Sequence, residues 1–277
     1  MMKTRPMMRW MACWLLLACL PCLAATELRI GIEPFFSPRM LIASFQPLRE
    51  QMATQLNCPV VLLTAPDYRQ FLTHIHRHDY DLVIASAAGA RYVQLHEGFV
   101  PSLKARGPYV GLLVTHRKRT GAVSKILADA RVALPDPLSL TGLMGETWLD
   151  RLGVHVQMQR YAFQNRAIDA VLRGDADFAI VSRNALSLLA STDRAALTVV
   201  AETGEAPNAV LLASGDLDDA ERLRYTDIVA NFINNHGQNS GFTNMLGISG
   251  ADPVAPGDLA LVDPLMLELQ RRLKAAM

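Results

Sequence analysis

Apolar positions in the first part of the chain change repeatedly between the spacing of strands and the spacing of helices. Short apolar runs bounded by Gly, Pro or Asp predict strands, and apolar residues recurring every three or four positions predict helices. The pattern predicts strands at 28–32, 60–63 and 82–84, a helix from Ser37–Pro38 to Leu56, and a short helix opening at Asp67. This alternation is typical of a parallel sheet covered on both faces.

The same alternation returns in the middle of the chain. Strands are predicted at 131–134 and 178–181, helices at 139–152 and 167–172, and an extended segment at 154–161. Strand-like segments flank this unit at 109–115 and 208–213, and a helix is predicted at 216–234. We interpret the chain as two α/β lobes joined by two extended crossings at the flanking segments. One continuous doubly wound sheet is the alternative.

This interpretation assigns residues 26–114 and 214–277 to lobe 1 and residues 115–213 to lobe 2. The C-terminal helices are expected to pack back on lobe 1.

The first 25 residues have the pattern of a secretory signal peptide. Lys3, Arg5 and Arg9 precede an apolar stretch at 10–20, and small residues follow at 22–25. The apolar stretch is shorter than the ~20 residues that span a bilayer. An alternative is a lipoprotein leader ending at Cys19. The protein is expected to be periplasmic.

The charge balance argues against a nucleic-acid-binding protein, and the cysteine content excludes a protein stabilised by internal disulfides. The whole chain has 27 basic and 26 acidic residues, and without the leader the formal charge is 24 minus 26, or −2. Such a balance gives no electrostatic case for a nucleic-acid partner. Cys58 is the only cysteine outside the leader, so an internal disulfide is excluded and the exported chain must be stable through its core.

Residues 135–142 are the most informative segment for chemistry. Two prolines end the preceding strand, and Ser139 then stands as an N-cap with Thr141 and Gly142 in the first turn. A helix start leaves backbone N–H groups unpaired and carries partial positive charge, so added hydroxyls create a small anion pocket. The alternative is that Ser139 only caps its own helix.

Other polar and aromatic residues follow the predicted strands of the first unit. Phe35 and Phe36 follow the first strand, Tyr68 the second and Ser86 the third. In open α/β sheets, ligands bind outside the carboxyl ends of the strands. Tyr68 and Ser86 are therefore candidate hydroxyl donors, and the two phenylalanines are either pocket walls or core.

Six motifs occur in the order typical of the phosphate/phosphite/phosphonate-type periplasmic solute-binding proteins of ABC transporters, which the chain resembles from about Glu27 to at least Leu212. They are residues 28–34 (LRIGIEP), 45–48 (FQPL), 65–71 (APDYRQF), 80–83 (YDLV), 136–142 (DPLSLTG) and 170–177 (AVLRGDAD).

This resemblance implies the type 2 periplasmic binding protein fold, with two lobes, two hinge crossings and a ligand cleft between the lobes. It implies that a serine- and threonine-rich helix start binds the oxyanion, here with Ser139, the backbone of Leu140, and Thr141. Gly142 in the same turn is a further candidate ligand contact. It also implies a ligand contact by Tyr68.

Three departures from the family pattern change the expected ligand. The middle hydroxyl of the helix start is replaced by Leu140, and a family histidine is replaced by Gln164 or Asn165. An acidic residue that can meet a ligand amine appears as Ser182. A plain oxyanion is therefore favoured over an aminoalkyl phosphonate.

Competing chemistry has little support in the sequence. His74, His76 and His78 could suggest a metal site, but they fall at the end of a predicted helix, where histidines suit the dipole. Asp175 and Asp177 are interpreted as turn and cap residues. The nucleophile elbow, the phosphate-binding loop and the zinc-protease motif are absent from the sequence. We therefore expect neither an enzyme nor a cofactor.

The sequence thus predicts a monomeric periplasmic receptor that binds a small oxyanion and delivers it to the membrane permease of an ABC transporter. The alternative is a ligand-sensing module that reports to a membrane kinase or a cyclic-dinucleotide enzyme.

Overall fold

The computed structural model of the protein describes residues 27–116, 121–236 and 241–275. The predicted leader and Cys19 lie outside the described residues. Within those three ranges, no helix combines the length and the apolar character needed to cross a bilayer.

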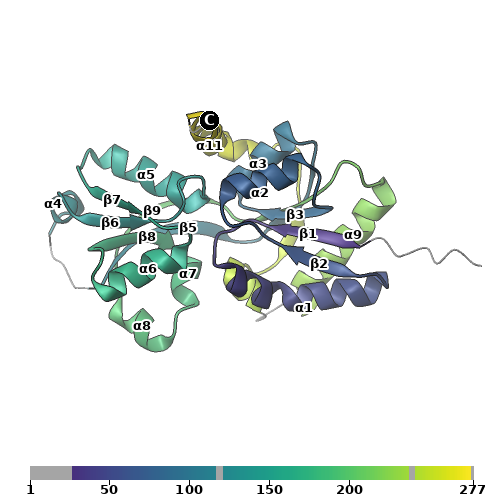
Figure 1. Cartoon of the computed structure of the whole chain (residues 1–277), viewed down its shortest axis with the longest axis horizontal. Coiled ribbons are helices and arrows are strands. Elements are labelled where there is room, and N and C mark those ends of the chain that lie inside the picture. Colours follow the sequence, from purple (N-terminus) through teal and green to yellow (C-terminus); the bar gives the residue numbers. More distant parts are fainter. Residues whose placement is uncertain (1–26, 117–120, 237–240, 276–277) are drawn as a thin grey trace, which may run out of the picture.

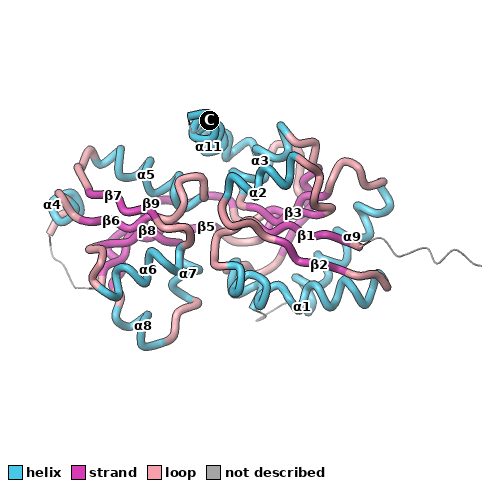
Figure 2. Tube along the Cα trace, in the orientation of Figure 1, coloured by secondary structure: helices cyan, strands magenta, loops and turns pink. Residues whose placement is uncertain are grey.

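The described chain forms two separate sheets, each with helices on both faces (Figures 1 and 2). The strand order is β11-β4-β10-β3-β1-β2 in the first sheet and β7-β6-β8-β5-β9 in the second. Two lobes are therefore confirmed and the single continuous sheet is excluded.

Lobe 1, built on the first sheet, draws on both ends of the chain. Its elements are β1 (Leu28–Ile32), α1 (Pro38–Leu56), β2 (Val60–Leu63), α2 (Tyr68–His76), β3 (Leu82–Ala85), α3 (Ala87–His96), β4 (Val100–Ala105), β10 (Val210–Ala213), α9 (Asp219–Asn231), a π-helix (Phe232–His236), α10 (Gly241–Leu246), β11 (Ala251–Pro253), a 3₁₀ helix (Asp258–Val262) and α11 (Asp263–Ala275).

Lobe 2, built on the second sheet, is one continuous stretch. Its elements are β5 (Pro108–Thr115), α4 (Val123–Leu127), β6 (Arg131–Leu134), α5 (Leu140–Leu152), β7 (Gln157–Arg160), α6 (Gln164–Arg173), β8 (Phe178–Ser182), α7 (Arg183–Ser187), α8 (Ser191–Ala196) and β9 (Thr198–Pro207).

Both sheets are mixed, whereas the sequence pattern predicted parallel ones. β2, β1 and β3 are parallel, as are β7, β6 and β8, but β10 and β5 run antiparallel to β3 and β8. β5 and β10 are the strands that the chain enters directly after each crossing, and each also pairs antiparallel with the strand before the other crossing, β5 with β9 and β10 with β4.

The crossings lie between β4 and β5 and between β9 and β10. The sequence pattern predicts them at 109–115 and 208–213. Residues 109–115 instead belong to β5, which is hydrogen-bonded to β8 and β9 in the second sheet. Residues 210–213 form β10 in the first sheet, so the crossings themselves are only a few residues long.

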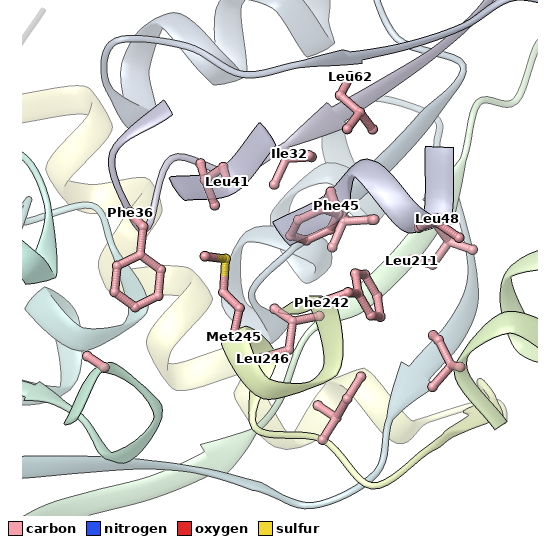
Figure 3. Close-up of a cluster of buried hydrophobic side chains, with 14 of the residues drawn as sticks. Ile32, Phe36, Leu41, Phe45, Leu48, Leu62, Leu211, Phe242, Met245 and Leu246 are labelled. Atoms are coloured by element: carbon pink, nitrogen blue, oxygen red, sulfur yellow. The ribbon is translucent and has the colours of Figure 1, made fainter. Parts of the chain in front are cut away.

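The core of lobe 1 lies between the sheet, α1 and α10. Helix α1 buries one face, formed by Leu41, Phe45, Leu48 and Met52. Figure 3 shows this face against Phe242 of α10, whose ring centroid is 4.8 Å from that of Phe45. Burying side chains of this size contributes about 1.5–3 kcal/mol each. Phe36, in the loop after β1, belongs to the same cluster of buried side chains.

The C-terminal helix α11 lies across the gap between α3 and α5 (Figure 1). It packs back on lobe 1, as predicted, where Asp263 accepts a hydrogen bond from Arg91 at 2.7 Å. It also contacts lobe 2, because Arg272 binds Glu146 of α5 at 2.7 Å and the carbonyl oxygen of Pro137 at 2.9 Å. α11 thus joins the two lobes beside the start of α5.

Candidate ligand-binding site

A small pocket lies between the lobes. Lobe 1 contributes Glu33, Phe35, Phe36, Tyr68, Ser86 and Met245, which follow β1, β2 and β3 or lie on α10. Lobe 2 contributes Tyr109, Leu140, Gln164, Ser182 and Asn184. The carboxyl ends of both parallel strand sets therefore meet at one pocket, as the topology of such sheets requires.

The start of α5 is held by hydrogen bonds within its own turn. The Ser139 hydroxyl donates to the carbonyl oxygen of Asp136 at 2.6 Å and accepts from the N–H of Gly142 at 3.0 Å. Ser139 therefore acts as the N-cap of α5. The N–H groups of Leu140 and Thr141 stand in the first turn, where the helix itself offers them no acceptor.

A buried polar network supports this helix start from the rest of lobe 2. The Tyr109 hydroxyl contacts Thr141 Oγ1 and accepts from the Gln164 amide at 3.3 Å. The Gln164 carbonyl in turn accepts from the N–H of Ser182 at 2.6 Å. Burial raises the pKa of Tyr109, so its hydroxyl stays protonated and neutral near pH 7.

On the lobe 1 side, the Glu33 carboxyl group lies at the start of α3. Glu33 Oε2 accepts from the N–H of Ser86, and Oε1 accepts from the Ser86 hydroxyl at 3.0 Å. Glu33 is only 3% exposed. Burial is the main cause that raises its pKa, to about 7, and the Ser86 hydrogen bonds oppose that rise.

Aromatic side chains close the lobe 1 wall. Phe35 and Phe36 pack edge to face with centroids 5.4 Å apart. Tyr68 is 4% exposed, and burial, followed by the charge of Glu33, raises its pKa well above the ordinary value. Tyr68 therefore faces the pocket as a neutral O–H group.

The lining has an unusual charge balance for an anion site. Among the described residues that line the pocket, Glu33 is the one ionisable acid and there is no lysine, arginine or histidine. Any attraction for an anion therefore comes from hydroxyls, amides and helix starts.

Six of the ten residues singled out from the sequence line this pocket: Phe35, Phe36, Tyr68, Ser86, Leu140 and Gln164. The remaining four lie outside the lining, within or beside the helix starts of lobe 2. Ser139 and Gly142 bond each other, and Thr141 contacts Tyr109. The side-chain oxygen of Asn165 is buried without a hydrogen-bond partner among the described atoms.

Several lining residues were not identified as site residues from the sequence. Glu33 directly follows the apolar strand β1, and its position at a strand end was a usable signal. For Tyr109 the sequence pattern predicts only a place in a crossing between the lobes. Asn184 and Asn208 both donate to the carbonyl oxygen of Leu246, at 2.5 and 3.1 Å, and these long-range contacts leave no local pattern.

The three histidines lie on or beside the last turn of α2, as expected. His74 pairs with Asp79, His76 with Glu97 and His78 with Asp216. Each histidine therefore bonds a different carboxylate.

Comparison of folds gives close matches to solved solute-binding proteins. PhnD1 of Prochlorococcus marinus (MIT 9301), solved with methylphosphonate, has a TM-score of 0.76 and 16% identity, covering 88% of this chain and 98% of that one. A binding protein component of an ABC phosphonate transporter from Pseudomonas aeruginosa has a TM-score of 0.74 and 17% identity, covering 91% and 89%. XAC2383 from Xanthomonas citri, solved with ATP, has a TM-score of 0.69 and 16% identity, covering 91% and 99%.

At these identities, the structural matches establish the type 2 periplasmic binding protein fold. Comparison with curated protein sequences gives no match. The family model for the periplasmic substrate-binding protein of phosphonate ABC transporters matches residues 30–259. This chain therefore belongs to the family of periplasmic phosphonate-binding proteins of ABC transporters.

Proposed function

We propose that the pocket between the lobes captures one small phosphonate-type oxyanion and that the closed protein delivers it to a membrane permease. The observation that carries this proposal is the convergence of neutral donors from both lobes on one pocket. Tyr68 comes from lobe 1, whereas Tyr109 and Leu140, the first residue of α5, come from lobe 2.

The number of donors is sufficient for useful affinity. A hydrogen bond to a charged group contributes about 1.5–3 kcal/mol, and a micromolar site needs about 8 kcal/mol. Four or five aligned donors supply that sum after the costs of ordering are subtracted. We assign the oxyanion to the N–H groups of Leu140 and Thr141, with Tyr68 and Tyr109 as the hydroxyl donors.

The proposed ligand stabilises the closed arrangement because it bonds both lobes at once. A ligand shifts a conformational equilibrium only by its difference in affinity for the two states. Here the open state would lose either the Tyr68 contact or the α5 contacts. The short crossings between β4 and β5 and between β9 and β10 are the hinge of this motion.

The experiment is calorimetry at pH 6 with methylphosphonate, phosphite, phosphate and sulfate. Tyr68→Phe removes one hydroxyl from the pocket, and we expect it to weaken binding of the best anion about tenfold or more. Tyr225→Phe is the matched control, because Tyr225 lies on α9, away from the pocket. Equal affinity in the two variants would remove Tyr68 from the site, and absence of binding for all four anions would refute the proposal.

The sensing alternative uses the same pocket and the same closure, so ligand binding does not distinguish it from transport. The membrane protein that binds the closed receptor distinguishes the two functions. Co-purification of the closed protein with a permease and its ATPase supports delivery, whereas co-purification with a membrane kinase or a cyclic-dinucleotide enzyme supports sensing.

A further inference from the structure

Glu33 is a buried acid inside a pocket that otherwise offers only neutral donors. Its two carboxyl oxygens both bond Ser86, through the backbone N–H and through the hydroxyl at 3.0 Å. Glu33 itself lines the pocket, as Ser86 does. The carboxyl group of Glu33 thus takes the position at the start of α3 where an external anion could bind.

Among the described residues, the side chains that face Glu33 include no cation to balance its charge. Ser86 on α3 donates to it, Tyr68 on α2 and Tyr109 on β5 are neutral hydroxyls, and Asp136 before α5 is a second acid whose charge disfavours ionisation of Glu33. No basic side chain belongs to the described lining of the pocket. An oxyanion placed here meets an ionised Glu33 with no cation between them.

We propose that Glu33 selects the ligand by its proton, so that the pocket binds an oxyanion only when one proton lies between the Glu33 carboxyl group and the ligand. This inference rests on the proposed function, because it concerns ligand choice at the same site. At a pH where both Glu33 and the free ligand are ionised, the proton is taken from solvent when the ligand binds and returns to solvent when the ligand leaves.

Two arrangements meet this condition. In the first, Glu33 is protonated and its O–H donates to Ser86 Oγ, so the Ser86 hydroxyl turns and becomes a donor to the anion. In the second, Glu33 is ionised and accepts a hydrogen bond from an acidic O–H of the ligand. Since burial raises the pKa of Glu33 to about 7, the first arrangement is available near neutral pH.

The condition separates two classes of oxyanion of similar shape. A phosphoryl group has a second proton that titrates at about pH 6, and phosphonates share this property of a second ionisation near neutrality. Sulfate has no proton to offer in this range, so it depends on a protonated Glu33. Above pH 7 we therefore expect the pocket to bind phosphonate-type acids more tightly than sulfate.

The decisive measurement is proton uptake, obtained by titration calorimetry at pH 8 in two buffers of different ionisation enthalpy. With methylphosphonate as the probe, we expect the wild-type protein to take up about one proton per ligand bound. Glu33→Gln mimics the protonated acid, since its amide can donate to Ser86 Oγ while its oxygen accepts from the Ser86 N–H. We expect this variant to take up almost no proton, and to favour methylphosphonate over sulfate at least tenfold less strongly than the wild type.

The control is Glu97→Gln, because Glu97 stands at the opposite end of α3 and accepts from His76. It should match the wild type in both measurements.

If Glu33 serves only as a helix cap, the wild type and Glu33→Gln take up the same number of protons when methylphosphonate binds. If the wild type binds methylphosphonate at pH 8 without taking up a proton, the inference is overturned and the proposed function still stands. The wild-type result decides even if Glu33→Gln fails to fold. Absence of binding by both anions at pH 6 and pH 8 overturns the inference and the proposed function together.

Discussion

The starts of α3 and α5 share one sequence pattern and one cap geometry, but they present different chemistry to the pocket. In each helix a serine N-cap is followed three residues later by glycine, whose N–H donates to the serine hydroxyl oxygen. The distance is 3.4 Å from Gly89 to Ser86 and 3.0 Å from Gly142 to Ser139. In lobe 2 the first residue of the helix, Leu140, lines the pocket, whereas in lobe 1 the Glu33 carboxyl group lies against the helix start.

The two helix starts differ in the group that accepts a hydrogen bond from the backbone N–H of the capping serine. In a capping box, a Glu at the third helical position accepts from that N–H. In α3 the third position is Gly89, and Glu33 from the neighbouring strand accepts from Ser86 instead. In α5 the N–H of Ser139 donates to the carbonyl oxygen of Asp136 at 3.0 Å. A helix start is therefore available to an external anion only where no internal carboxylate has taken it.

The largest effect expected from this contrast is on the pH dependence of stability. The pKa of Glu33 is about 7 in the folded protein against an ordinary 4.5, so between these values the folded state binds more protons than the unfolded state. Stability therefore falls as pH rises from 4.5 to 7, by about 3 kcal/mol from this group. Denaturant unfolding at pH 5 and pH 8 should show this loss in the wild type and not in Glu33→Gln. Equal losses in both proteins would mean that Glu33 is ionised at both pH values.

The glycines at the third helical positions provide a second way to separate the two helix starts. A Cβ at Gly142 would lie 2.2 Å from the carbonyl oxygen of Asp136, a backbone atom that cannot move aside. A Cβ at Gly89 would lie 3.0 Å from Glu33 Oε1, the end of a side chain. We expect Gly142→Ala to lower the free energy of unfolding by about 2 kcal/mol, and Gly89→Ala to change it by less than about 1 kcal/mol. Urea denaturation of both variants checks this, and equal effects would contradict the difference in crowding.

Much of the fold could be predicted because the buried strands and amphipathic helices have strong periodicity. β1, β2, β3, β6 and β8 are apolar throughout or nearly so, and each was predicted within a residue or two of its bounds. The missed strands, β4, β9 and β11, have other compositions, and β4 buries only Leu103. β9 buries only Thr203 and Ala206 along its ten residues, and β11 has three residues. Their strand state depends on pairing with β5 and β4, which no local pattern reports.

The site could be predicted only in part, for a similar reason. Tyr68, Ser86 and Leu140 follow strands or open helices, so the position of strand ends located them. Sequence spacing could not show that the Ser139 hydroxyl is used within its own turn. Nor could it show that Glu33 reaches the start of α3, because residues 33 and 86 meet only through the pairing of β1 with β3.

The smallest expected effect concerns the two capping serines and tests the comparison most directly. Ser139→Ala removes a cap and should cost about 1 kcal/mol of stability at both pH 5 and pH 8. Ser86→Ala removes a cap of the same kind, but its hydroxyl also donates to Glu33 at 3.0 Å. That hydrogen bond favours the ionised carboxylate, so its loss raises the pKa of Glu33 further and costs roughly 1 kcal/mol more at pH 8 than at pH 5, where the weaker bond of the neutral carboxyl group is lost. Unfolding of both variants at the two pH values measures the difference, and a cost for Ser86→Ala that does not change with pH would show that the two helix starts are chemically equivalent.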